Sequence, residues 1–524
     1  MSVIENTWLN DGFHAARVEL TQGLRGSLLR GMLCSSTDEL EQTLDALVEF
    51  NRSDYRVQLR FAVLEHVIRA CSLLSRPYGV AQPDNEGDEA HWTEPMRELV
   101  REGVLGYNLI VNELLQTDPF PGYVQLLAIA LERTVRFLGL LVLERYENYT
   151  MPTGQVWFAL HRFFAYAEAK ALQDVSVELP VRPHQGTIAR AYKQILVTAL
   201  ADPYRLAPGH AWSLYLFLRD WVDSCEIVAS TGEDSDKPYG FVVDLGSDDE
   251  AHFSLLQSDP YVSAEQHRRI ELADFIVAIE GYISKLDQQG GRGAERDDPN
   301  VQRSTLQMLK RALHAWKRNS HRQAFRYQSE EIVDIVWGVD QIYQFLRSDE
   351  VAHSVATNVM AQPMMSDGDL VCCQVLNEST GGFCLNMAAN VVDPANRLAV
   401  GHVVLVVTGD EAQEPRKLVC IVRWLQDQGD DGVRFGIQIL GQGAQPLRVL
   451  PLSDGAAGKE RNAVRILSRV THAGGMLIAP VDLYRPDRFL LVTAETEQIL
   501  VRVSALLEEG TDHVQVRYES DSPF

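Results

Sequence analysis

The period of the hydrophobic pattern changes once along this chain of 524 residues, from a helical to a strand-like spacing near residue 330. Before that point, apolar residues recur at helical spacing, as Leu40, Leu44 and Leu47 do within residues 39–50. After it, short runs alternate apolar with polar residues and are bounded by Gly, Asn and Asp, which is typical of antiparallel strands. We therefore expect a multidomain protein in which a large all-α N-terminal region precedes β structure.

Proline- and glycine-containing breaks divide the N-terminal region, for which we predict helices over residues 39–50, 56–74, 124–146, 156–172, 187–200 and 211–228. No fixed repeat period joins them, so a tetratricopeptide-like array is not expected. The most apolar of these helices, 124–146, is interrupted by Glu132, Arg133 and Arg136. That interruption suits a buried helix better than a membrane span.

Residues 229–262 are rich in Asp and Glu and include two strand-like runs, 239–245 and 251–256, which we interpret as an acidic hairpin. The carboxylates lack the spacing of an EF-hand loop, so a calcium site is not predicted. A long helix is predicted over 264–286. The glycine-rich stretch that follows, 288–294, is the strongest candidate for a linker between domains.

Composition excludes several classes of function. A formal net charge of −24 argues against a nucleic-acid coat and against docking on anionic lipid. The seven cysteines are odd in number and contain no CxxC pair, so neither a disulfide framework nor a zinc ribbon is expected. The N-terminal segment lacks the apolar core of a signal peptide. We expect a cytoplasmic protein that binds no nucleic acid and does not insert into a membrane.

One segment departs from the acidic average. Residues 301–329 contain no Asp or Glu and end in three regularly spaced arginines, Arg318, Arg322 and Arg326. Part of this charge belongs to the exposed face of an amphipathic helix. Each arginine at its end has a guanidinium group that can donate two parallel hydrogen bonds to phosphate oxygens or to the O6 and N7 atoms of guanine.

The β-rich third is predicted to contain strands over residues 332–337, 370–376, 382–387, 402–407, 418–425 and 433–440, with a short helix over 339–346. Short strands bounded by turn residues predict a small antiparallel barrel. Alternation resumes over 461–467, 475–478, 489–493, 499–504 and 514–518, which predicts a second small β module.

The turn between two of these strands carries a recognisable motif. Asn377-Glu-Ser379-Thr-Gly-Gly382 matches the [D/N]xSxxG signature of PilZ domains, and Arg322 and Arg326 supply an upstream RxxxR. The strands around Cys420–Trp424 and Gly432–Gly436 resemble the pair that closes the PilZ barrel. The resemblance covers residues 318–445.

The resemblance to PilZ domains implies a six-stranded barrel that binds cyclic diguanylate, a bacterial second messenger. It implies that the arginines, Arg318 included as part of an overlapping RxxxR, contact guanines and phosphates. It also implies that Asn377, Ser379 and Gly382 cradle the ligand from the barrel surface. About fifty residues separate Arg326 from Asn377, more than is usual for the family. The inserted helix and the loop around Pro363 are in a position to cover the site.

We therefore predict four domains: helical (1–228), acidic hairpin plus long helix (229–290), PilZ-like barrel with its preceding basic helix (301–450) and a small β module (455–524). The function predicted is that of a cyclic diguanylate effector that acts through its helical region on an unidentified protein partner. No Walker loop, GxSxG, HExxH, Rossmann, GGDEF-like or EAL-like motif occurs, so we predict no enzyme activity, cofactor or metal. The alternatives are a nucleotide-independent scaffold with a degenerate barrel and, less favoured, an enzyme of unknown type in the helical region.

Overall fold

A computed structural model describes most of the chain. The described residues are 37–70, 94–120, 122–178, 185–230, 239–255, 265–289, 299–317, 326–329, 331–356, 370–389, 397–408, 415–453, 456–457, 459–470, 474–485, 488–494, 497–510 and 513–520. The chain divides into two compact units, the first of residues 1–203 and 209–320 and the second of residues 204–208 and 321–524.

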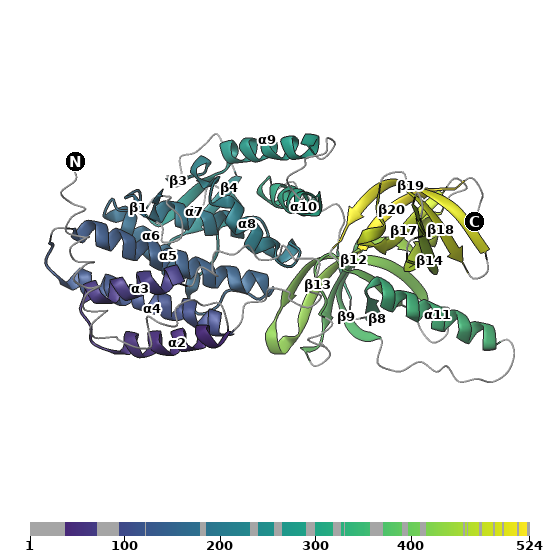
Figure 1. Ribbon diagram of the computed structural model, residues 1–524, viewed down its shortest axis with the longest axis horizontal. Coiled ribbons are helices and arrows are strands. Elements are labelled where there is room, and N and C mark those ends of the chain that lie inside the picture. Colours follow the sequence, from purple (N-terminus) through teal and green to yellow (C-terminus); the bar gives the residue numbers. More distant parts are fainter. Residues whose placement is uncertain are drawn as a thin grey trace. The chain divides into compact units, whose positions relative to one another are not determined.

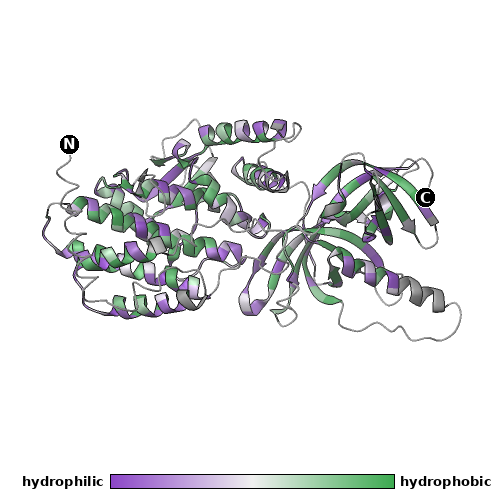
Figure 2. Ribbon diagram, viewed as in Figure 1, coloured by the Kyte–Doolittle hydropathy of each residue, from purple (hydrophilic) through white to green (hydrophobic). Residues whose placement is uncertain are grey.

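The first unit is built mainly of helices around α5 (Figure 1). Its helices are α2 (Thr37–Arg52), α3 (Val57–Ala70), α4 (Glu94–Gln116), α5 (Tyr123–Glu147), α6 (Val156–Ala169), α7 (Ile188–Ala199), α8 (His210–Leu218), α9 (Ala273–Gln289) and α10 (Pro299–Trp316). Helix α5 packs against α4, α6, α7 and α8 and is apolar on nearly every side, as a helix buried all round must be. The surrounding helices carry both hydrophobic and hydrophilic residues (Figure 2). Among the described residues, no helix has the length and apolar character needed to cross a membrane.

The prediction of an all-α N-terminal region is only partly confirmed, because strands also occur there. β1 (Val177–Glu178) pairs with β2 (Gln185–Gly186), and β3 (Glu226–Ala229), β4 (Tyr239–Asp244), β5 (His252–Leu255) and β6 (His267–Glu271) form a sheet in the order β3-β6-β4-β5. The predicted acidic hairpin is β4 paired with β5.

Two helix predictions in this region were too long. The helix predicted over 211–228 ends at Leu218, and the one predicted over 264–286 is preceded by strand β6. In β6, burial alternates, with Arg268 and Ile270 turned inward. The Nε atom of Arg268 lies 3.0 Å from Oε2 of Glu168 on α6. Pairing with β3 and β4 and this ion pair outweigh the local helical pattern.

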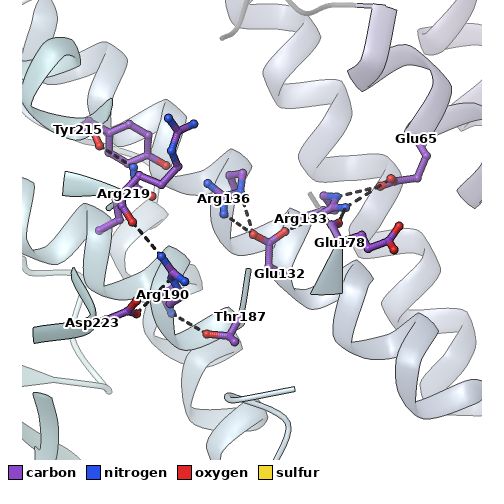
Figure 3. Close-up of polar contacts among 11 residues, drawn as sticks. Glu65, Glu132, Arg133, Arg136, Glu178, Thr187, Arg190, Tyr215, Arg219 and Asp223 are labelled. Carbon is purple, nitrogen blue, oxygen red and sulfur yellow. Dashed lines mark hydrogen bonds and ion pairs between the residues drawn. The ribbon is translucent and has the colours of Figure 1, made fainter. Parts of the chain in front are cut away.

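A buried ionic network joins α3, α4 and α5 (Figure 3). Arg133 donates from Nε to Glu65 over 2.9 Å, from Nη1 to Glu132, and from Nη2 to the carbonyl of Glu178 over 2.6 Å. Glu132 also accepts from Nε of Arg136 over 2.8 Å, and Glu65 accepts from the Tyr107 hydroxyl over 2.8 Å. The charges that interrupt the apolar sequence of α5 are therefore paired with one another inside the helical unit.

The basic helix α10 packs within this first unit. The Trp316 indole N–H donates to the carbonyl of Val197 over 3.0 Å, and its ring lies edge-on to Phe275 with centroids 4.8 Å apart. Lys310 and Lys317 pair with Asp287 and Glu280 of α9. Much of the positive charge of the helix is thus matched by neighbouring carboxylates.

We expect a fragment that begins at His321 to fold alone, because the second unit has its own buried core. A fragment that begins at Ala294 would expose the α10 residues Leu309 and Trp316, which are 0% and 2% exposed in the full chain. Far-UV circular dichroism and dye binding to exposed apolar surface should separate the two fragments. A shorter fragment without a cooperative β transition would contradict this prediction.

The second unit contains two closed barrels. The first consists of β7 (Tyr327–Gln328), β8 (Ile332–Trp337), β9 (Val371–Ser379), β10 (Gly382–Met387), β11 (Val403–Thr408), β12 (Arg416–Asp427) and β13 (Val433–Gln442). Antiparallel pairing runs β8-β9-β10-β13-β12-β11 and returns to β8, while β7 pairs with the end of β9. The predicted barrel is confirmed, and β8 and β10 have the bounds expected from the sequence.

The C-terminal module is a second closed barrel with the same ring order. It comprises β14 (Ala444–Ser453), β15 (Ala456–Ala457), β16 (Arg461–Ile466), β17 (Gly474–Pro480), β18 (Phe489–Ala494), β19 (Glu497–Glu509) and β20 (His513–Glu519). Pairing runs β14-β16-β17-β20-β19-β18 and returns to β14. When the short strands β7 and β15 are left out of the count, the ring order in both barrels is first, second, third, sixth, fifth and fourth strand. β14 is not among the predicted strands, since Pro446 and Pro451 weaken the strand pattern.

The third strand begins with a tightly packed glycine in each barrel. A Cβ atom on Gly382 would lie 1.9 Å from the carbonyl oxygen of Ile437 on β13. A Cβ atom on Gly474 would lie 1.9 Å from the carbonyl oxygen of Tyr518 on β20, the matching last strand. The two barrels therefore share a local packing feature as well as a topology.

The inserted helix, predicted over 339–346, extends as α11 (Val339–Ala356) and lies beside both barrels (Figure 1). Its residues Ile342 and Leu346 share one apolar core with Val336 and Leu405 of the first barrel and Ile466 of the second. Residues 357–369, which include the loop around Pro363, lie outside the described part. Helix α11 thus packs against both barrels through one shared apolar core.

Candidate functional site

Alternation along β10 separates the two faces of the first barrel. Leu385 and Met387 point into the core and are 0% and 1% exposed, so Cys384 and Asn386 belong to the outer face. The same outer face extends onto the two neighbouring strands, because Cys384 lies opposite Asn377 on β9 and opposite Gly436 on β13. We call the surface the β10 face. Its members are Arg326, Asn377, Ser379, Gly382, Cys384, Trp424, Arg434, Gly436 and Gln438.

The NxSxxG segment forms the tight turn between β9 and β10. The Ser379 hydroxyl donates to the carbonyl of Gly382 over 3.2 Å and accepts the N–H of Gly381 over 3.3 Å, so it shapes the turn. No side chain fits at Gly382, because the carbonyl of Ile437 occupies that space. The motif therefore brings the backbone of β10 close to that of β13.

Asn377 lies on the same face, on β9 directly opposite Cys384 of β10. Its side chain hydrogen-bonds the Cys384 thiol. Burial raises the pKa of that thiol, while Arg326, Arg434 and the bond from Asn377 act to lower it. The thiol at the centre of the face is therefore held in its neutral form, and the positive charge around it comes from the two arginines.

Arg326 comes level with Ser379, because the next residues on β7, Tyr327 and Gln328, pair with Glu378 and Asn377. Arg434 lies on the other side, on β13 opposite Asn386 of β10. Both arginines are exposed, and neither has a hydrogen bond or ion pair within the described part of the chain. By contrast, Arg133, Arg268 and many other arginines are engaged by carboxylates. Two uncommitted guanidinium groups on one sheet face form a site for an anion or a guanine edge.

An aromatic residue that the sequence prediction did not select completes this face. Trp424 lies opposite Gly436, and a Cβ atom on Gly436 would lie 1.9 Å from the indole Nε1. The indole therefore lies across the glycine, on the face that also carries Cys384. The Trp424 and Gly436 pair belongs to the two strands that resemble the closing strands of the PilZ barrel, so that resemblance contained the signal.

The structure brings together Arg326, Asn377, Ser379 and Gly382, four of the six predicted ligand-binding residues. Arg318 and Arg322 lie outside the described residues. In the described part of the chain, no group of three or more His, Cys, Asp or Glu is arranged to hold a metal ion. The β10 face offers guanidinium, amide and indole groups, which suit recognition of a planar anion.

Comparison with known proteins matches two family models to this chain. The model of the "Cyclic-di-GMP receptor FimW, N-terminal domain" matches residues 35–231, and the model of the "Cyclic-di-GMP receptor FimW, middle PilZ domain" matches residues 353–446. A solved structure of K. pneumonia MrkH in its apo state covers 36% of this chain and 86% of its own, at 8% identity and a TM-score of 0.14, which is too low to support a structural comparison. No curated protein matches the chain.

The chain is a PilZ-domain protein, as the residues of the NxSxxG segment predicted. It belongs to the cyclic-di-GMP receptor family that the two matching models describe, with the N-terminal domain of that family before the PilZ domain. The matched PilZ segment contains Asn377, Ser379, Gly382, Trp424 and Gly436 and begins after Arg326.

Proposed function

We propose that this protein binds cyclic diguanylate on the β10 face and acts as an effector of that second messenger. The observation that carries the proposal is the placement of Arg326 and Arg434 on either side of a strip of small residues, with neither guanidinium engaged by another described residue. Membership in a cyclic-di-GMP receptor family supports the choice of ligand.

The chemistry of the ligand fits the groups on this face. Cyclic diguanylate carries two negative phosphates and two guanines, and guanidinium groups bond in pairs to phosphate oxygens and to the O6 and N7 edge of guanine. Because Gly382 and Gly436 have no side chains and that of Ser379 is short, the surface of this face is formed by the strand backbone and by the Trp424 indole, which lies across Gly436. The Trp424 indole supplies an aromatic surface, and stacking of a base on an aromatic side chain is worth about 1–3 kcal/mol.

The test is a calorimetric titration of the full chain with cyclic diguanylate. We expect saturable binding at micromolar or better affinity, which raised salt weakens because charge pairing contributes. Cyclic diadenylate is the matched control, since it keeps the phosphates but lacks guanine O6. Failure of cyclic diguanylate to bind up to millimolar concentration would favour the alternative of a nucleotide-independent scaffold.

The helical unit is the proposed output region, acting on a protein partner in the cytoplasm. A ligand shifts a conformational equilibrium only as far as its affinities for the two states differ. The binding energy at Arg326 is available for such a shift, because this residue directly follows the segment 318–325 that connects α10 to the first barrel. A partner captured only in the presence of nucleotide would support the effector role, whereas equal capture without nucleotide would support the scaffold.

A further inference from the structure

Two β-bulges, one in each barrel, bring a pair of charged residues together. On β12 the register shifts between Val422 and Trp424, which places the bulge at Arg423. On β19 a register shift lies between Leu506 and Glu508. Bulges re-aim side chains and are frequent beside functional sites. Here the two bulges set Arg423 of the first barrel against Glu508 of the second.

The contact between them is a forked ion pair. Arg423 donates from Nη2 to Oε2 of Glu508 over 2.8 Å and from Nη1 to Oε1 of the same carboxylate. The side chains are 30% and 20% exposed, so water screens the pair only partly. A two-donor fork of this kind fixes the orientation of the guanidinium plane as well as its position.

The third donor of Arg423 reaches the β10 face. Its Nε donates to Oε1 of Gln438 over 2.7 Å. Because a guanidinium group cannot accept a hydrogen bond, this contact fixes which end of the Gln438 amide is the oxygen. The amide nitrogen of Gln438 makes no hydrogen bond within the described part of the chain, so its two N–H donors stay available.

Gln438 lies on the β10 face, where those donors can bond to a ligand. It is exposed and sits on β13 directly opposite Gly382, at the corner formed by the NxSxxG turn. Phosphate oxygens and guanine O6 and N7 are acceptors, and a primary amide held by its oxygen presents only donors to them. A free Gln side chain would instead rotate and present either end.

We infer that Glu508 of the second barrel is a positioning residue of the nucleotide site in the first, acting through Arg423 on the Gln438 amide. The inference rests on the proposed function, since it concerns the same β10 face. It assigns the second barrel a part in ligand binding: the carboxylate holds the guanidinium, and the guanidinium holds the amide with its N–H groups free for the ligand.

The experiment measures the dissociation constant of cyclic diguanylate by calorimetry and the melting temperature of the full chain for matched variants. Glu508→Gln should weaken binding by about three- to tenfold, the equivalent of roughly one hydrogen bond. Gln438→Ala should weaken it similarly, and the double variant should bind no more weakly than Gln438→Ala alone, because both changes remove one linked interaction. Glu519→Gln is the control, since it breaks an exposed Arg–Glu pair with Arg502 elsewhere on the second barrel.

A charge swap separates positioning from stability. Either single change, Arg423→Glu or Glu508→Arg, breaks the ion pair between the barrels and should lower the melting temperature. The double variant restores an ion pair, so its melting temperature should return to near the wild-type value. A carboxylate at position 423 can only accept, so it would take an N–H of Gln438, and affinity should remain low. Recovery of both properties, or wild-type affinity in Glu508→Gln, would overturn the relay while leaving the proposed function intact. Absence of binding in the wild-type chain would instead overturn both.

Discussion

Replacing Arg326 with lysine should weaken the binding of cyclic diguanylate at least about tenfold, as should Arg322→Lys. Lysine keeps the positive charge but offers a single ammonium group in place of a planar two-donor fork. A good two-donor contact is worth about 1–3 kcal/mol. The loss therefore reports recognition of guanine edges and phosphate oxygens, beyond simple attraction of an anion. Titration calorimetry at constant salt is the measurement.

Two further variants serve as controls for this prediction. Arg303→Lys changes an arginine of α10 in the first unit and should leave affinity nearly unchanged. Ser379→Ala should cost less than either arginine variant, because its hydroxyl is engaged within the turn and one neutral hydrogen bond is worth about 1 kcal/mol. Equal and small effects at all four positions would show that the RxxxR spacing is an accident of an arginine-rich chain.

Much of the fold could be predicted because local pattern and tertiary structure agree. The core strands of the first barrel alternate, and β8 and β10 have the predicted bounds. The pattern failed where distant contacts decide the structure. The sequence of β6 predicts helix, but β6 forms a strand because it pairs with β3 and β4 and because its Arg268 bonds to Glu168. The identical ring order of the barrels was also hidden, since it depends on pairings such as β14 with β18, far apart in sequence.

The site was predictable to a similar extent. The motif located Asn377, Ser379 and Gly382, because a tight turn with a close backbone approach requires those residue types at fixed spacing. Trp424 and Arg434 were not selected, since they reach the same face only through strand register. Gln438 and Glu508 depend on two bulges and on a contact between barrels. No spacing rule in the sequence reveals such a contact.

Replacing Arg133 with methionine should destabilise the helical unit by about 3–5 kcal/mol, the usual cost of removing one partner from a buried ion pair. Glu132 is 0% exposed and Glu65 is 4% exposed, so inside the core Glu65 would lose its ion-pair partner and Glu132 would keep only Arg136. Hydrogen exchange of the α5 amides in the full chain measures the local free energy of unfolding. Arg101→Met is the control, because Arg101 pairs with Glu98 at the surface and should cost at most about 1 kcal/mol.

The pH dependence of this effect distinguishes charge from packing. Burial acts to raise the pKa of Glu132, but Arg136 and Arg133 together outweigh it and hold that pKa below its ordinary value. A carboxyl with a lowered pKa in the folded state contributes stability that is present above its unfolded pKa, about 4.3, and is lost as pH falls through the folded value. The wild type should therefore lose stability on acidification. In Arg133→Met, only Arg136 remains to oppose the effect of burial on the pKa of Glu132. Glu132 should therefore take up a proton at a higher pH than in the wild type, and the stability deficit of the variant should shrink between pH 7 and pH 4. A deficit that stays constant over this range would mean that Arg133 stabilises the unit by packing, and that its charge contributes little.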